Sequence, residues 1–313
     1  MASERAEQLQ QELHRRILVL DGAMGTTLEA LHLSAADFGG AEFEGCLEHL
    51  NLTRPDVVAA VHRQYLAAGA DIIETNTFGS TALVLAEYPP LQERAYEITL
   101  AGARLARQAA DACSTAARPR FVAGAMGPTN RSISLTGGVT FAELIENYRE
   151  QARALLAGGV DYLLIETAQD TRHVKAALLA VEQLSEEMGQ PIPVAVSGTI
   201  EPAGTMLAGQ TVEAFTISLQ HAPLLYIGLN CATGPELMTD HLRSMAELAP
   251  FPVACVPNAG LPDADGRYKE TPEMFAAALR RFVAEGWVNL IGGCCGTTPA
   301  HIARLAAVAA TGR

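Results

Sequence analysis

A (β/α)8 barrel, with eight parallel strands inside a ring of helices, is the fold that this sequence predicts. Short apolar runs rich in β-branched residues occur eight times, and each precedes a stretch of helical length rich in Ala, Leu, Glu and Arg. The runs are almost continuously apolar, as expected for parallel strands buried on both faces. No compositional break divides the 313 residues, so eight strand-helix units in one barrel are favoured. A doubly wound open sheet is the alternative.

The predicted elements follow one another along the chain. The strands are ILVL 17–20, DIIET 71–75, RFVAGA 120–125, DYLLIET 161–167, IPVAVSG 192–198, LLYIGLN 224–230, FPVACV 251–256 and WVNLIG 287–292. The helices are predicted at 54–68, 91–112, 141–157, 171–187, 211–221, 235–248, 272–285 and 300–310. Residues 1–16 are polar and amphipathic, which predicts a helical extension, and 26–53 is predicted as an irregular insertion. We therefore expect one domain over 1–313, with the barrel at 17–311.

Composition excludes several classes of protein. With 35 acidic and 22 basic residues the net charge is -13, which opposes binding to the phosphate backbone of a nucleic acid. The N-terminus is not a secretory signal, and no apolar run reaches the roughly 18 residues of a membrane span, so a cytoplasmic location without membrane association is expected. Six cysteines in such a chain indicate reduced thiols, metal ligands or catalysis more than a disulfide framework.

Three of the six cysteines follow predicted strands, where barrel proteins carry their chemistry. Cys231 follows the sixth strand, and the adjacent Cys294 and Cys295 follow the eighth. The histidines lie mostly in predicted helices or in the insertion, so a metal site at this end would be a thiolate site. Cys255 lies inside an apolar run and Cys113 near a helix end, and neither is expected to have a functional role.

Three thiolates suit Zn²⁺, which takes sulfur ligands in tetrahedral geometry and leaves a fourth position open in catalytic sites. Neighbouring side chains on a strand point apart, but Gly292, Gly293 and Gly296 would let the backbone leave strand geometry so that both sulfurs face one ion. Two alternatives remain at this point: a buried pair of small apolar residues, or a redox-active vicinal disulfide.

A set of motifs occurs in a fixed order: DGAMGT 21–26, LNLTRPDVV 50–58, YLAAGADIIETNTFGS 65–80, GPTNRS 127–132, GLNCATGP 228–235 and GGCCGTTPAHI 292–302. With them the chain resembles, over about 17–311, the homocysteine-binding domain of zinc-dependent homocysteine methyltransferases. The resemblance is closest to cobalamin-dependent methionine synthases. It implies the barrel fold, which the strand count indicates independently.

The resemblance also implies a metal site. Its three zinc-binding cysteines correspond to Cys231, Cys294 and Cys295, and the sulfur of homocysteine would be the fourth ligand. Zinc would stabilise the substrate thiolate, which then attacks an activated methyl group. Asn258 matches the family's oxygen ligand in the absence of substrate, while a simple turn residue in P-N-A-G is the alternative for this position.

Residues for the amino-acid end of homocysteine follow from the same resemblance. Asp21 and Glu166 match the acids that bind the ammonium group, and the backbone amides of Gly22 and Ala23 match the carboxylate site. Glu74 is added because it also ends a strand, the alternative being a carboxylate bonded to neighbouring backbone amides. Three further residues are expected to line the pocket without direct chemistry: Asn76, Thr77 and Asn130.

The expected methyl donor is methylcobalamin, regenerated from methyltetrahydrofolate. Its cobalamin-binding and folate-binding domains would belong to a longer chain of which this barrel is a fragment. The alternative is a free-standing enzyme that uses S-methylmethionine or betaine. Betaine is disfavoured, because an aromatic cage is the usual way to hold a quaternary ammonium and only 5% of the residues are aromatic.

Two readings from other classes stay open on the sequence alone. The barrel could be a metal-free redox or scaffold protein with a vicinal disulfide between Cys294 and Cys295. It could also be a homocysteine-binding module without turnover of its own. Metal content separates the first of these from the enzyme, and methyl transfer separates the second.

Overall fold

The computed structural model describes residues 2–312, and its strands form one closed parallel sheet. The sheet order is β1-β8-β7-β6-β5-β4-β3-β2, and a parallel bridge between Leu20 and Ile72 joins its two ends. The strands are β1 (Leu18–Val19), β2 (Ile72–Glu74), β3 (Phe121–Met126), β4 (Tyr162–Ala168), β5 (Val194–Gly198), β6 (Ile227–Asn230), β7 (Val253–Val256) and β8 (Leu290–Ile291). The predicted barrel is confirmed, and the alternative of an open doubly wound sheet is wrong.

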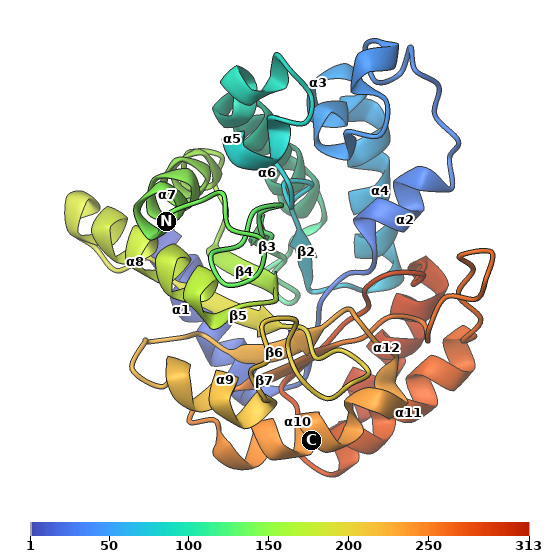
Figure 1. Ribbon diagram of the computed structural model, residues 1–313. Coiled ribbons are helices and arrows are strands. Elements are labelled where there is room, and N and C mark those ends of the chain that lie inside the picture. The colour runs from blue at the N-terminus through green and yellow to red at the C-terminus, as the bar shows by residue number, and fades with distance from the viewer. Residues whose placement is uncertain (1, 313) are drawn as a thin grey trace.

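Helices surround the strands, as Figure 1 shows. The main ones are α4 (Pro55–Ala68), α6 (Ala95–Cys113), α7 (Phe141–Ala157), α8 (Thr171–Met188), α9 (Val212–Leu219), α10 (Pro235–Leu248), α11 (Pro272–Ala284) and α12 (Pro299–Thr311). All eight lie where the sequence predicts a helix. None of the helices within residues 2–312 combines the length and the apolar character needed to cross a bilayer.

The insertion predicted as irregular folds into short helical turns near the carboxyl end of β2. These turns are α2 (Met24–Glu29), η1 (Ala41–Phe43), η2 (Leu47–His49) and α3 (Leu50–Thr53), while α5 (Ala82–Leu85) and η3 (Leu91–Arg94) follow β2. The side chain of Asn51 donates to the Asn76 carbonyl at 2.8 Å, and that of Asn76 donates to the Leu47 carbonyl at 2.8 Å. These buried hydrogen bonds attach the insertion to the segment after β2.

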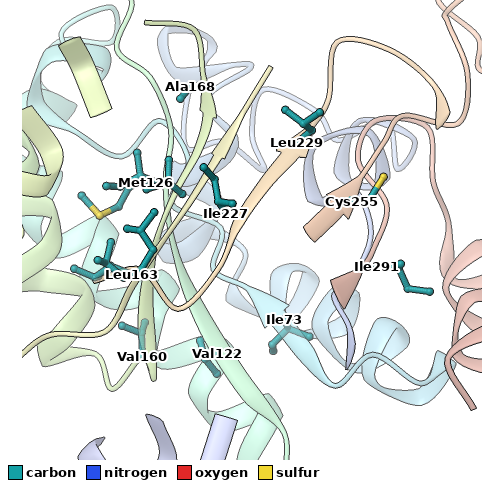
Figure 2. Packing of buried hydrophobic residues seen from close by; sticks show 14 of the residues in the cluster. Ile73, Val122, Met126, Val160, Leu163, Ala168, Ile227, Leu229, Cys255 and Ile291 are labelled. Atoms are coloured by element: carbon teal, nitrogen blue, oxygen red, sulfur yellow. The ribbon is translucent and has the colours of Figure 1, made fainter. Parts of the chain in front are cut away.

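Successive side chains along each strand point to opposite faces of the sheet, and this alternation produces two hydrophobic cores. One face of each strand packs against the helices, and Figure 2 shows Ile73, Val122 and Leu163 among the side chains of this outer core. The other face fills the barrel with residues such as Phe121 and Ile72. The interior is therefore packed with side chains and is not a pore.

Helix α1 (Ala2–Arg15) belongs to the inner core. Its Leu9 and Leu13 are fully buried among the residues that fill the barrel, and the Leu13 carbonyl accepts a hydrogen bond from Asn289 just before β8. Figure 1 shows α1 crossing behind the strands. The sequence predicted this helix but not its packing, which covers the amino-terminal end of the barrel.

Leu13→Ala should destabilise the fold because it leaves a cavity where α1 meets the barrel interior. Truncation of a fully buried leucine costs about 2–5 kcal/mol, and urea denaturation measures the loss. The matched control is Leu207→Ala, since this leucine is 52% exposed and its truncation should change stability by less than about 0.5 kcal/mol. Equal losses of stability in the two variants would contradict the packing of α1 as a plug, which means a helix that closes the amino-terminal end of the barrel.

Candidate metal and substrate site

Three thiols meet at the carboxyl ends of β6 and β8. The sulfur atoms of Cys231, Cys294 and Cys295 all lie within 4.8 Å of one another. Cys295 Sγ is 3.8 Å from Cys231 Sγ and 4.0 Å from Cys294 Sγ, and all three cysteines are free. The sequence predicted this set, and the fold brings its members together.

The spacing of the sulfurs fits a tetrahedral metal ion. Ligands at about 2.3 Å from a tetrahedral zinc have sulfur atoms about 3.8 Å apart, close to the two measured distances. Hydrogen bonds from Cys231 and Cys294 lower the pKa of Cys295 to about 3, while the same kind of contact raises the pKa of Cys294. The pKa of Cys231 is raised as well, so the three thiols interact with one another, and thiolates suit a soft divalent ion.

One of the three glycines around the two adjacent cysteines, Gly296, leaves strand geometry as the sequence indicated. Strand β8 ends at Ile291, and Gly296 has φ +78, which L side chains rarely adopt. A Cβ atom on Gly296 would lie 2.2 Å from the ring of Tyr268, so only glycine fits there. Thr298 then caps α12 and Pro299 begins it, with the Thr298 N–H donating to His301 Nδ1 at 3.2 Å.

Three acids lie beside the thiols at the ends of β1, β2 and β4. Asp21 is 2% exposed and Glu166 is 8% exposed. Asp21 Oδ2 accepts the Glu74 backbone N–H at 3.1 Å, whereas Asp21 Oδ1 is buried with no hydrogen-bond partner in the described part of the chain. The backbone amide of Glu74 thus supports Asp21, while the predicted role of the Glu74 carboxyl group in substrate binding stays a prediction.

Burial and mutual repulsion keep these acids from ionising easily. Desolvation, followed by the charge of Glu74, raises the pKa of Asp21, and desolvation raises the pKa of Glu74 to about 7. Desolvation and then Glu74 also raise the pKa of Glu166. A cation placed among the three carboxyl groups would relieve both effects, because it favours their charged forms.

The predicted carboxylate donors, Gly22 and Ala23, differ in availability. Gly22 packs so closely that a Cβ there would lie 2.6 Å from the Tyr65 ring. The Ala23 N–H already donates to Thr297 Oγ1 at 3.2 Å, and the Ala23 carbonyl accepts from the Tyr65 hydroxyl at 3.0 Å. The Ala23 amide thus has a partner within the protein, and its predicted role in binding the substrate carboxylate stays a prediction.

Asn258 lies beside the thiol cluster and is 3% exposed. Its Oδ1 accepts the backbone N–H of Cys295 at 3.1 Å, and its own backbone N–H donates to the Thr233 carbonyl at 3.0 Å. Its side chain therefore supports the loop that carries Cys295. The predicted role as a fourth metal ligand stays a prediction.

A cavity of about 260 Å³ is lined by the three thiols and by two of the three acids, Glu74 and Glu166. Its lining contains Glu48, Glu74 and Glu166 but no Lys, Arg or His among the residues that the structure describes, so it is acidic. Leu47 and Glu48 come from the insertion, and sequence reasoning missed them because nothing in an irregular segment indicates which residue faces inward. Phe78, 40% exposed, is the aromatic residue in this lining.

Of the remaining predicted residues, some line the cavity and others lie away from it. Asn76 lines the cavity, as expected, whereas Thr77 is fully buried and bonds to the Ala125 carbonyl at 2.8 Å. Asn130 is exposed and donates to Glu87 at 2.7 Å, away from the cavity lining. Cys255 is buried in the outer core, as Figure 2 shows, and burial raises the pKa of its thiol.

Fold and site together define a barrel protein with a thiol cluster and an acidic cavity at the carboxyl ends of its strands. The chain belongs to the homocysteine S-methyltransferase family, whose model matches residues 18–309. The match spans nearly the whole barrel, in agreement with the resemblance drawn from the motifs.

Crystal structures of the homocysteine methyltransferase MmuM from Escherichia coli are similar to this chain. The metallated form has a TM-score of 0.75 at 26% sequence identity, covering 93% of this chain and 96% of that one. The oxidized form has a TM-score of 0.74 at 25% identity, covering 93% and 95%. The apo form has a TM-score of 0.70 at 26% identity, covering 94% and 96%.

Glu74→Gln should stabilise the metal-free protein in a pH-dependent way. Because the folded-state pKa of about 7 lies above the ordinary 4.5, ionisation of Glu74 opposes folding. This penalty is absent below pH 4.5, grows as the pH rises toward 7 and is complete above it. Urea denaturation at pH 5 and pH 8 should therefore show a gain confined mainly to pH 8, of roughly 1–3 kcal/mol.

The matched control is Glu247→Gln on α10, because this acid is exposed to water. Its substitution should change stability little at either pH. A gain for Glu74→Gln that is equal at pH 5 and pH 8 would contradict the electrostatic origin of the effect.

Proposed function

We propose that this barrel methylates the sulfur of homocysteine with the help of Zn²⁺ held by Cys231, Cys294 and Cys295. The observation that carries the proposal is the thiol cluster, whose sulfur spacings of 3.8 and 4.0 Å suit a tetrahedral ion. Family membership supports methyl transfer to homocysteine as the reaction. Because only three thiols converge, a fourth position is left for the substrate sulfur.

When bound, the ion supplies a positive charge that stabilises the thiolate form of homocysteine, whose thiol alone is mostly protonated at neutral pH. The chain supplies the rest. Asp21, Glu74 and Glu166 lie near one another and are proposed to bind the substrate ammonium group, with Asp21 Oδ1 having no hydrogen-bond partner in the described part of the chain. We propose that the backbone N–H of Gly22 donates a hydrogen bond to the carboxylate of homocysteine.

All of these groups come from one barrel, so we propose that the domain over 1–313 contains the complete homocysteine site. They also lie on strand ends, which are rigid elements that hold reacting groups in place. The site therefore orients homocysteine by its amino-acid end while its sulfur faces the thiol cluster, and orientation of this kind supplies much of the rate in transfer reactions.

For the methyl donor, the acidic cavity favours a small cation. Glu48 adds a further carboxyl group to the lining, and no basic side chain within the described residues balances it. A sulfonium such as S-methylmethionine carries a positive charge on the group that loses methyl, so a carboxylate lining attracts it. Betaine is less suited, because Phe78 alone does not make an aromatic cage. We therefore propose S-methylmethionine as the donor.

Methylcobalamin is the second candidate. The motifs LNLTRPDVV 50–58 and ETNTF 74–78 favour it, because they resemble the cobalamin-dependent enzymes more than the other zinc barrels. In that case the cobalamin-binding and folate-binding domains would be partners of this barrel. That expectation stays a prediction.

Metal content tests the zinc site. The protein purified under reducing conditions should contain about one zinc per chain, and Cys231→Ala should contain less than about a tenth of that, since two thiolates alone bind zinc much more weakly. Elemental analysis after gel filtration measures both. Cys113→Ala, a partly buried cysteine on the outer side of the barrel, is the matched control and should keep its metal. Equal zinc in all three proteins would contradict the proposed ligands.

Methionine formation tests the reaction and its donor. Zinc-loaded protein is incubated with homocysteine and, in parallel, with S-methylmethionine, betaine or free methylcobalamin. S-methylmethionine should give methionine, and Cys295→Ala should reduce the rate at least about 100-fold, because a metal ligand is removed. Turnover with methylcobalamin alone would overturn the cationic donor, and no methionine from any donor would overturn catalysis by this chain.

A further inference from the structure

Strained backbone gathers at the ends of β4 and β6. Within the described residues, four residues other than glycine have positive φ, and three of them lie there: Thr167 (φ 55), Cys231 (φ 59) and Ala232 (φ 56). This conformation is most unfavourable for a β-branched residue such as threonine. Non-glycine residues with this backbone conformation are strained and persist only where surrounding interactions hold them.

The side chain of Asn230 holds Thr167 by two hydrogen bonds. Asn230 Oδ1 accepts the Thr167 N–H at 2.9 Å, and Asn230 Nδ2 donates to Thr167 Oγ1 at 2.8 Å. Asn230 is 3% exposed, whereas Thr167 is partly exposed, so both bonds are partly buried. Strand β4 shifts register against β5 between Ile165 and Ala168, which frees the Thr167 N–H from the regular strand ladder for this contact.

The two bonded residues are sequence neighbours of two groups in the site. Asn230 immediately precedes Cys231, a proposed metal ligand, and Thr167 immediately follows Glu166, a proposed acid for the substrate ammonium. Strands β4 and β6 do not pair with each other, because β5 lies between them. The Asn230 side chain is thus a direct link from the strand of the thiol to the strand of the acid.

We infer that Asn230 is a positioning residue, which holds Glu166 at the correct place for the homocysteine ammonium by stabilising the left-handed backbone of Thr167. This inference rests on the proposed function. Asn230 and Thr167 both line the cavity, but the role proposed for Asn230 is exerted through Thr167 and not through a contact of its own with the substrate. Without the two hydrogen bonds, Thr167 relaxes toward negative φ, and the peptide unit that it shares with Glu166 rotates. The acid then leaves its position while the three thiols keep theirs.

The test compares two thiols on zinc-loaded protein. Homocysteine carries the ammonium group, whereas 4-mercaptobutyrate has the same thiol and carboxylate without it. By calorimetric titration, Asn230→Ala should bind homocysteine about tenfold more weakly and bind 4-mercaptobutyrate within about twofold of the parent. Zinc content should stay near one per chain.

A second variant tests whether Asn230 acts through Thr167. Glycine adopts positive φ without steric cost, so Thr167→Gly removes the strain that the hydrogen bonds oppose. In the Thr167→Gly background, Asn230→Ala should weaken homocysteine binding by no more than about threefold, which makes the two substitutions non-additive. The comparison of Thr167→Gly with the double variant also tests the role of Asn230 if Asn230→Ala alone is too unstable to assay.

The outcomes are distinguishable. Equal weakening of both thiols, loss of zinc in Asn230→Ala, or the same tenfold loss in both backgrounds would overturn the positioning role. If the parent protein itself binds zinc but neither thiol, the proposed function fails before the role of Asn230 is in question.

Discussion

The convergence of three thiols from two non-adjacent strands is the constraint on which the rest of the site depends. Strand β7 separates β6 from β8, so the chain must leave strand geometry at both ends before the sulfurs can meet. It does so with left-handed backbone at Cys231 and at Gly296. Glycine adopts this conformation freely, but cysteine does so only because the closed sheet and its surrounding helices hold it there. The thiol cluster therefore requires rigid strand ends.

The acids beside the cluster add a second constraint, which is electrostatic. Asp21, Glu74 and Glu166 are brought together without a cationic side chain in the cavity lining that the structure describes. Such an arrangement opposes folding, since buried carboxyl groups are desolvated and repel one another. It becomes favourable when cations arrive from outside. The empty site lowers the stability of the fold, and a bound cation compensates the charge of the carboxyl groups. Such a site binds small cations better than a neutral pocket would.

The barrel supports this end of the molecule from both sides. Below the site, inward side chains and the plug helix α1 fill the interior, so the strand ends rest on a packed core. Above it, the insertion is attached through Asn51 and Asn76 and contributes Leu47 and Glu48 to the cavity lining. Strand ends thus form one side of the cavity and the insertion covers the other, which limits the access of water to the thiol cluster.

The sequence by itself determined the barrel, its eight strands and helices, and the identity of the thiol cluster. These follow from local physics, because apolar periodicity defines each element and parallel strands bring their carboxyl ends to one edge. Only the tertiary structure decided which backbone and side-chain groups already have partners within the protein. The backbone N–H of Ala23 donates a hydrogen bond to Thr297, and Asn130 lies outside the cavity. The side chain of Asn230 forms hydrogen bonds with Thr167 although a strand lies between their two strands. Such outcomes depend on contacts between residues distant in the chain, and strand periodicity carries no information about them.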